Sequence, residues 1–273
     1  MYFITVSEMV GTKGKNIAQE VAKTLNYDYY GEERLLEAAG EMGFLPDVQQ
    51  MDEKAPHLFE KLFSEKPKIH LDRLQSVIFE VAKKGDAVFF GKGSQLLLRS
   101  FDCALHVLVT GSKEKRVQRV MEEHQVGREV AEKIIERSDN DKRGFLRFAF
   151  DEDWLNPQLY DLVLNTDKLG VASAAKMIVD AAKSDEIKAC GVDSVRSLGI
   201  LSLTRKVESS FLEAGIVSPH VFFNVEDVDS IRLYGIVSSQ EEKKSVERIV
   251  NGIKGIKRME NDITVFRGSM GGE

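Results

Sequence analysis

Apolar residues along the first two thirds of the chain follow two alternating spacings, one typical of strands and one typical of helices. The run "YFITV" is short and rich in β-forming side chains, and it leads into a glycine-bearing turn. Apolar residues then recur at helical spacing, at Ile17, Ala18, Val21, Ala22 and Leu25. This order predicts a strand, a loop and a helix.

The same alternation continues to about residue 183. Further strands are predicted at three apolar runs, "AVFF", "CALHVLVT" and "YDLVLNT". Helices are predicted between and after them, over residues 74–82, 116–123 and 171–179. Three prolines within residues 46–67 predict short helices and surface connections. Alternating strands and helices are typical of an α/β fold with a mostly parallel sheet and helices on both faces.

The pattern changes after Lys183. Residues 184–197 have weak periodicity and are predicted to be a linker. Residues 198–268 then predict a helix, two alternating strands, "HVFFNVED" and "SIRLYGIVSS", a second helix and a last strand, "DITVFRG". The order α-β-β-α-β describes a compact, small α+β unit. We therefore expect two domains, at residues 1–183 and 198–268.

Composition narrows the class of protein and its compartment. With 273 residues, 42% of them hydrophobic, the chain can build one or two buried cores. A net charge of −6 argues against broad binding of nucleic acid, which needs a basic face. No apolar run reaches the roughly 20 residues that span a bilayer, and the N-terminus lacks the pattern of a signal peptide, so we expect a cytoplasmic protein. Cys103 and Cys190 form no C-x-x-C pair and are expected to be buried or incidental thiols.

The loop after the first strand, residues 11–16, is the first candidate for chemistry. Its glycines let backbone N–H groups approach an anion, and the following helix presents its positive N-terminal end there. Against the phosphate-loop pattern G-x-x-x-x-G-K-[ST], Gly14 and Lys15 fit, whereas Met9 and Asn16 do not. The alternative interpretation is a turn between strand and helix that binds no ligand.

Two further basic segments are candidates for the same site. "GKGSQLLLR" places Lys92 in a glycine loop after a later strand, and the carboxyl ends of parallel strands share one edge of a sheet, where ligands bind. The segment 137–147, which we call the lid, carries four basic residues among acidic ones, and arginine forks match phosphate oxygens. The alternatives are a solvated loop lysine and a solvated helix face.

Other arrangements typical of catalysis are not indicated. The five histidines show no spacing typical of a metal site, and His106, inside an apolar strand, is expected to be structural. Trp154 is expected to pack where the lid segment returns to the sheet. No Ser-His-Asp or Cys-His arrangement follows from the pattern.

Taken together, these motifs resemble those of a known family. The "G-x-x-G-[KR]" loop, the "G-[KR]-G" loop after a later strand, the segment "HVLVTGS", the lid and "YDLVLNT" occur in the order of the cytidylate-kinase-like branch of nucleoside monophosphate kinases. This resemblance covers about residues 1–183. Residues 198–268 resemble a BON domain, a small module associated in other proteins with membrane or partner contacts.

The first resemblance implies a P-loop fold that transfers a phosphoryl group from ATP to a nucleoside monophosphate, CMP or dCMP, with Mg²⁺. The implied residues of the donor site are Gly11, Thr12, Lys13, Gly14, Lys15 and Asn16. The implied residues of the acceptor site are Arg34, Lys92, Asp139 and Asp141. The implied catalytic residues are Lys15, Arg137 and Arg143, and the implied metal ligand is Asn16.

Departures from the family pattern leave three hypotheses open. Asn16 offers an amide oxygen where a P-loop hydroxyl normally holds Mg²⁺, and Lys92 stands where an arginine is usual. The first hypothesis is an active kinase with an accessory BON-like domain for partner or membrane contact. The second is a nucleotide-binding sensor with weak or no activity that signals through that domain. In the third, the BON-like unit is the main functional part and the first domain is a scaffold.

Overall fold

The computed structural model describes residues 2–51, 56, 64–216 and 220–266. It divides into two units, which are described separately. The first contains the described residues of Met1–Leu45, Met51–His57 and Lys84–Gly191, and the second contains those of Pro46–Gln50, Leu58–Lys83 and Val192–Glu273. Half of the proline-bearing stretch 46–67, residues 52–55 and 57–63, lies outside the described residues.

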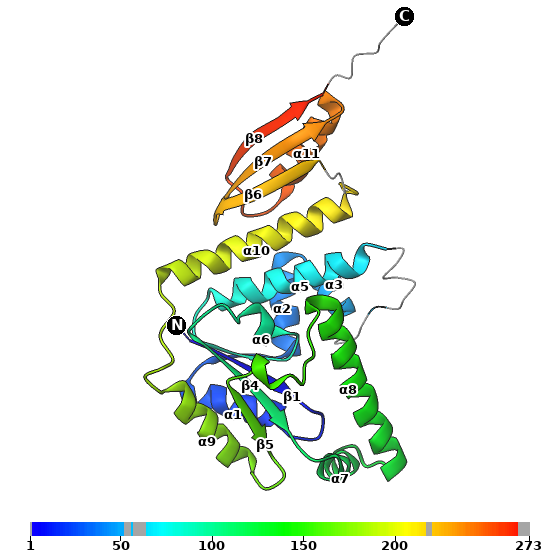
Figure 1. Cartoon of the computed structure of the whole chain (residues 1–273), viewed down its shortest axis with the longest axis vertical. Helices are drawn as coiled ribbons and strands as arrows, with labels where there is room; N and C mark the ends of the chain where they lie inside the picture. The colour runs from blue at the N-terminus through cyan, green and yellow to red at the C-terminus, as the bar shows by residue number, and fades with distance from the viewer. Residues whose placement is uncertain (1, 52–55, 57–63, 217–219, 267–273) are drawn as a thin grey trace, which may run out of the picture. The chain divides into compact units, whose positions relative to one another are not determined.

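A five-stranded parallel sheet, in the order β2-β3-β1-β4-β5, forms the centre of the first unit (Figure 1). Its strands are β1 (Phe3–Glu8), β2 (Asp28–Tyr30), β3 (Ala87–Phe90), β4 (Ala104–Thr110) and β5 (Leu162–Asn165). Its helical elements are α1 (Gly14–Leu25), α2 (Glu32–Met42), α6 (Ser94–Leu97), α7 (Lys113–His124), α8 (Arg128–Phe150), the short η1 (Pro157–Leu159) and α9 (Val171–Ala182). The predicted α/β class with a parallel sheet flanked by helices is confirmed.

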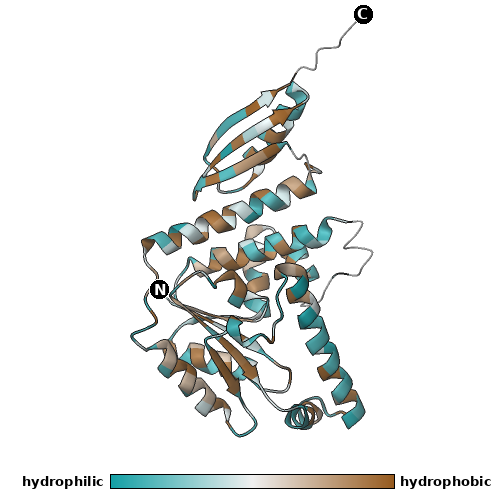
Figure 2. Ribbon diagram, in the orientation of Figure 1, coloured by the Kyte–Doolittle hydropathy of each residue, from teal (hydrophilic) through white to brown (hydrophobic). Residues whose placement is uncertain are grey.

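One face of this sheet is covered by α1 and α9 (Figure 1). Ile17 and Val21 of α1 and Ile178 of α9 are buried against Val6 and Val107 of the central strands. These residues occupy the helical and strand spacings from which the elements are predicted. In Figure 2 the strands are mostly hydrophobic, whereas α7 and α8 carry many hydrophilic side chains. Burial of each large aliphatic side chain contributes roughly 1.5–3 kcal/mol, which fixes α1 and hence the loop before it.

The opposite face of the sheet carries aromatic side chains and one buried histidine. The rings of Phe3 and Phe89 meet edge to face at 6.2 Å, and Tyr30 stacks on Phe89 at 5.4 Å. Nδ1 of His106 lies 2.8 Å from Oγ1 of Thr5, on the neighbouring strand. Burial lowers the pKa of His106, so the imidazole stays neutral in the structural role that its place in an apolar strand predicts.

The second unit contains a second sheet, of three strands in the order β6-β7-β8. β6 and β7 are antiparallel, and β7 and β8 are parallel. Its described elements are α3 (Leu45–Gln50), α5 (Lys66–Ala82), α10 (Val192–Glu213), β6 (Val221–Asp227), β7 (Ser230–Val237), α11 (Gln240–Gly252) and β8 (Arg258–Val265). The order of elements predicted for the C-terminal part, α-β-β-α-β, is therefore confirmed.

Helix α10 begins at Val192, inside the stretch predicted to be a linker. Its periodicity is weak because it is buried on two sides. Phe211 packs in the core of the three-stranded sheet with Leu233, while Ser202 faces α5, where it donates a hydrogen bond of 2.9 Å to Glu80. A helix with apolar residues toward one neighbour and small polar residues toward another has no single apolar stripe.

The expectation of two separate thiols is wrong, because Cys103 and Cys190 form a disulfide, with their Cα atoms 5.1 Å apart. Cys103 directly precedes β4, and Cys190 lies beyond α9, 87 residues later in the chain. The spacing of the two cysteines does not indicate the pair, because only the folded path of the chain between them brings them together.

We expect Cys190→Ser to unfold at a lower temperature than the wild type when both are kept without reductant. Opening a covalent loop of this length increases the conformational freedom of the unfolded chain, at a cost of about 2–4 kcal/mol. Calorimetry measures the difference, and in dithiothreitol the two proteins should unfold together. Two titratable thiols in wild-type protein unfolded without reductant would contradict the disulfide.

Asp72 predicts a pH dependence of stability in the second unit. Burial first, and then the charge of Glu208, raise the pKa of Asp72 to about 7, although Arg205 lies 3.5 Å away. In the unfolded chain this carboxyl ionises near its ordinary pKa, so between about pH 4 and 7 only the folded protein keeps the proton, and stability falls as pH rises. We expect Asp72→Asn to gain stability over the wild type across that range and to keep the gain at higher pH.

Thermal unfolding of both proteins from pH 4 to 9 measures this effect. Asp193→Asn, which neutralises an exposed carboxylate on α10, is the control and should follow the wild type. A lower melting temperature for Asp72→Asn than for the wild type at pH 8 would contradict the prediction.

Candidate active site

The loop between β1 and α1 is shaped by two close approaches that only glycine permits. Gly11 has φ 85°, and a Cβ atom there would lie 2.8 Å from the backbone oxygen of Arg116. A Cβ atom on Gly14 would lie 2.5 Å from the Cβ atom of Glu8. Thr12 is buried, and its hydroxyl donates to the carbonyl oxygen of Met9 at 2.7 Å, which closes the turn. The loop therefore has a defined conformation without a ligand.

The amino end of α1 faces this loop and can bind an anion. Lys13 takes a left-handed conformation, with φ 62°, as the residue before the helix, and its side chain caps no N–H group. The first turn of α1 contains no acidic residue. Lys13, Lys15 and Asn16 are exposed there. Since N–H groups at a helix start carry partial positive charge, the predicted donor residues form an arrangement suited to phosphate.

Arg116, on α7, supports the loop from behind. Only 3% of this residue is exposed, and Nε donates to the carbonyl oxygen of Val10 at 2.7 Å. Its two terminal nitrogens donate to both carboxylate oxygens of Asp139, at 2.9 and 2.7 Å. One buried guanidinium thus joins the loop to the lid segment on α8.

Arg119, one turn further along α7, makes a second connection. It donates to the carbonyl oxygen of Gly11 at 3.3 Å and to the hydroxyl and carbonyl oxygens of Thr166, at 3.0 and 2.5 Å. The hydroxyl of Thr166 also lies 3.2 Å from the carbonyl oxygen of Thr12. The carbonyl oxygens of Gly11 and Thr12 are therefore bonded to side chains that lie behind the loop.

The lid segment forms part of a single 23-residue helix, α8. Ile135, Asp139, Lys142 and Leu146 follow one stripe of this helix, at spacings of four, three and four residues. Ile135 and Leu146 are buried. The two implied catalytic arginines bond within α8, since Nε of Arg137 lies 3.7 Å from Asp141 and Arg143 donates to Asn140 at 2.8 Å.

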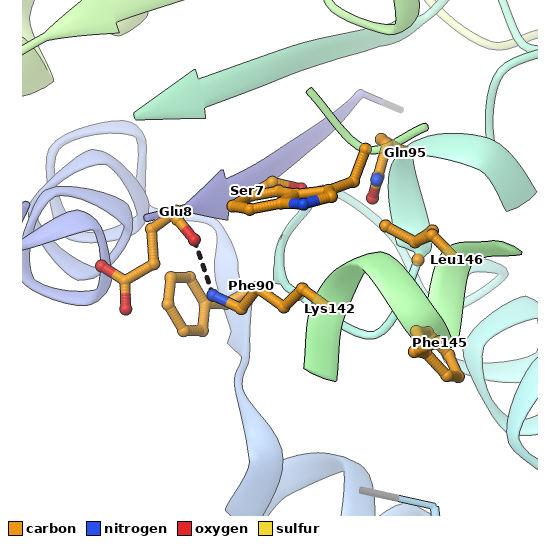
Figure 3. Close-up of a pocket in the computed structure, with 10 residues that line it drawn as sticks. Ser7, Glu8, Phe90, Gln95, Lys142, Phe145 and Leu146 are labelled. Carbon is orange, nitrogen blue, oxygen red and sulfur yellow. Dashed lines mark hydrogen bonds between the residues drawn. The ribbon is translucent and has the colours of Figure 1, made fainter. Parts of the chain in front are cut away.

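Lys142 is the lid residue that contacts the edge of the sheet. Its Nζ donates to the carbonyl oxygen of Glu8, the last residue of β1, at 2.6 Å (Figure 3). The same Nζ lies 5.7 Å from the centre of the Trp154 ring. Trp154 is buried, as its expected packing role requires. Lys142 therefore links α8 directly to the strand that leads into the phosphate loop.

A small pocket lies between these groups (Figure 3). Its lining includes Ser7, Glu8, Gln95, Lys142 and Trp154, and its volume of about 20 Å³ holds a single water. Within the described part of the chain, Oε1 of Gln95 and Nε1 of Trp154 are buried without a hydrogen-bond partner. The pocket is thus small, and its mostly apolar lining contains a few polar groups.

Lys92 and Arg34 are the two other residues implied for the acceptor site. Lys92 has φ 58° and donates from Nζ to the carbonyl oxygen of Met51 at 2.8 Å. Arg34 lies 3.0 Å from Asp28 and 5.1 Å from the centre of the Tyr30 ring. In the sheet, β2 is level with the first half of β1, because Asp28 and Phe3 both pair with Ala87. The contacts of Arg34 are therefore not at the edge where the phosphate loop begins.

Three residues of this site are not predicted by the sequence pattern: Glu8, Arg116 and Arg119. The two arginines belong to a helix predicted only as charged, and their i, i+3 spacing was the available signal that both face one side. Lys142 was part of the basic cluster, and the stripe that it shares with Ile135 and Leu146 indicates that it points inward. Glu8 ends an apolar strand and carried no signal of its own.

The residues present fit a nucleotide phosphate better than they fit a metal ion alone. Asn16 lies at the exposed start of α1 and can offer an amide oxygen, and the carboxylate of Glu8 lies nearby. Among the described residues, no group of three or more His, Cys, Asp or Glu side chains could hold a metal ion. Mg²⁺ commonly takes most of its ligands from phosphate and water, so this set is compatible with it.

No described helix is both long and apolar enough to cross a membrane.

One solved structure shows the same fold over the matched part of this chain. A crystal structure of an uncharacterized protein from Eubacterium ventriosum ATCC 27560 is similar, with a TM-score of 0.55 and 20% identity over 67% of this chain and 99% of that one. Shikimate kinase from Bacteroides thetaiotaomicron aligns with a TM-score of 0.40 and 9% identity over 67% and 99% of the two chains. Dephospho-CoA kinase from Campylobacter jejuni aligns at 0.32 and 14%, over 66% and 94%.

No curated protein matches the sequence. The model of the cytidylate kinase-like family matches residues 3–168, which is more than half of the 273 residues. That match contains the phosphate loop, Lys92, both arginines of α7 and the lid. The chain therefore belongs to the cytidylate kinase-like family.

Proposed function

We propose that this protein transfers a phosphoryl group from ATP to a nucleoside monophosphate, CMP or dCMP. The observation that carries the proposal is the glycine loop between the carboxyl end of β1 and the amino end of α1, in which the carbonyl oxygens of Val10 and Gly11 accept hydrogen bonds from Arg116 and Arg119. Membership of a kinase-like family supports the same reaction.

In this proposal catalysis consists of positioning and charge neutralisation. Lys15 and the backbone of the loop hold the donor phosphates, and Arg137 and Arg143 approach them when the lid closes. Lys92 holds the phosphate of the acceptor. Asn16 would be the ligand from the loop for Mg²⁺, which would supply positive charge to neutralise the charge that develops on the phosphates.

A nucleotide-binding sensor with weak or no activity is the second candidate. The observation that favours it is the small size of the pocket beside Glu8 and Lys142, whose volume is only about 20 Å³. Asn16 favours it as well, because an amide is a poorer ligand for Mg²⁺ than a hydroxyl or carboxylate.

For the C-terminal part, we propose a BON-like accessory role in contact with a partner or a membrane surface. Its outer sheet face supports this, since Phe222 and Tyr234 are about half exposed and their rings stack at 5.7 Å. Exposed paired aromatics on a sheet favour contact with another surface. A location in the cytoplasm belongs to the same proposal. Co-sedimentation of the full chain with vesicles tests the membrane contact.

We expect Lys15→Ala to lower turnover by at least 100-fold and to weaken ATP binding about tenfold, because it removes the cation next to the donor phosphates. A coupled assay with ATP, Mg²⁺ and each monophosphate, together with calorimetry, measures both effects. Lys23→Ala, which removes an exposed lysine from the last turn of the same helix, should change neither. Wild-type binding without turnover for any monophosphate would favour the sensor.

We expect Lys92→Arg to lower KM for the monophosphate about three- to tenfold while kcat changes little. A guanidinium can form two parallel hydrogen bonds to a phosphate, whereas an ammonium acts as a point charge. Initial rates over a range of monophosphate concentrations give the two constants. An unchanged KM would remove Lys92 from the acceptor site.

A further inference from the structure

Glu8 places a carboxylate of the protein itself at the amino end of α1. Its Oε2 accepts a hydrogen bond from the backbone N–H of Lys15 at 3.3 Å. The same oxygen would lie 2.7 Å from a Cβ atom on Gly14, so the side chain runs along the first turn of the helix. The first turn has no acidic residue of its own and no side-chain cap from Lys13. Glu8 therefore supplies the anion that this helix end attracts.

One hydrogen bond holds the backbone of Glu8 in place. Its carbonyl oxygen accepts this bond from Lys142, at the end of β1. The carboxylate of Glu8 also acts on Tyr29, whose pKa is raised to about 12, mainly by burial and then by the charge of Glu8. The negative charge of Glu8 therefore belongs to the surroundings of the loop.

A phosphate bound in the loop would need the N–H group that Glu8 now occupies. The Glu8 carboxylate and a phosphate cannot both accept from the Lys15 N–H at short distance, because their negative charges repel each other, most strongly where solvent is partly excluded. A nucleotide that arrives with a divalent cation brings positive charge next to the displaced carboxylate, whereas a bare phosphate does not.

We propose that the Glu8 carboxylate occupies the place of a donor phosphate and so makes the loop select a cation-complexed nucleotide over free phosphate anions. This inference rests on the proposed function, since it concerns the donor site of the same reaction. Glu8 is then a residue that determines specificity.

The experiment measures binding of three probes to the full chain by calorimetry: pyrophosphate in EDTA, ATP in EDTA, and ATP with Mg²⁺. We expect Glu8→Gln to bind pyrophosphate and metal-free ATP at least tenfold more tightly than the wild type, and ATP with Mg²⁺ within threefold. Glu8→Asp keeps the charge on a shorter side chain and should fall in between. Glu20→Gln removes a carboxylate further along α1 and should match the wild type throughout.

Hydrogen exchange at the Lys15 amide provides a readout without any nucleotide, and it should be faster in Glu8→Gln because an amide is a weaker acceptor than a carboxylate. Unchanged or weaker binding of the metal-free probes in Glu8→Gln would overturn the inference, as would weaker binding of ATP with Mg²⁺ alone, which would make Glu8 a metal ligand. Pyrophosphate binding to neither protein would overturn it too. If pyrophosphate and ATP bind as expected but no monophosphate is phosphorylated, the proposed function fails and the inference stands, whereas absence of ATP binding with Mg²⁺ would overturn both.

Discussion

The arrangement of the site depends on one buried guanidinium, that of Arg116. A charge that is 3% exposed is tolerated only where its donors are satisfied, and here three of them meet the carbonyl oxygen of Val10 and both carboxylate oxygens of Asp139. Removing either partner would leave a buried charge without compensation, at a cost of about 3–5 kcal/mol. The loop and the lid helix are therefore held in one arrangement by the same group.

This constraint changes the interpretation of the lid. Asp139 was expected to meet the acceptor, but its carboxylate is bonded to Arg116 and serves as the point where α8 is anchored. Arg137, by contrast, has a side chain that is 77% exposed, with a screened contact to Asp141 that is weak enough to exchange for a phosphate. Helix α8 thus carries both an anchored carboxylate, at Asp139, and an exposed guanidinium, at Arg137.

The alternating strands and helices of the first unit could be predicted from the sequence because burial imposes a visible period. β1, α1 and the glycine loop follow from residues 2–25 alone, since apolar spacing switches once from two to about four residues. The element order of residues 198–268 follows in the same way. Helix α10 was predicted to start later, because its first six residues, 192–197, include no buried side chain and so show no apolar period.

Contacts between charged or polar groups distant in the chain could not be predicted. Arg116 pairs with Asp139, and Cys103 with Cys190, through the folded path of the chain, and no local period records such a pair. Glu8 is similar, because an acid at the end of a strand has the same pattern whether it faces solvent or a helix end. The sequence therefore indicates which charged residues lie at one edge of the sheet, whereas only the structure shows which of them pair.

The pairing also decides how a ligand could enter. Lys142 lines this small pocket, where it makes a charge-assisted hydrogen bond to the carbonyl oxygen of Glu8 and lies near the ring of Trp154. A ligand that displaces this lysine must replace both contacts, and phosphate oxygens are strong hydrogen-bond acceptors for an ammonium group. Because Lys142 and Asp139 share one stripe of α8, movement of the lysine can proceed by its flexible side chain while Arg116 still holds the helix. A ligand could therefore displace the Lys142 side chain while Asp139, on the same helix, stays bonded to Arg116.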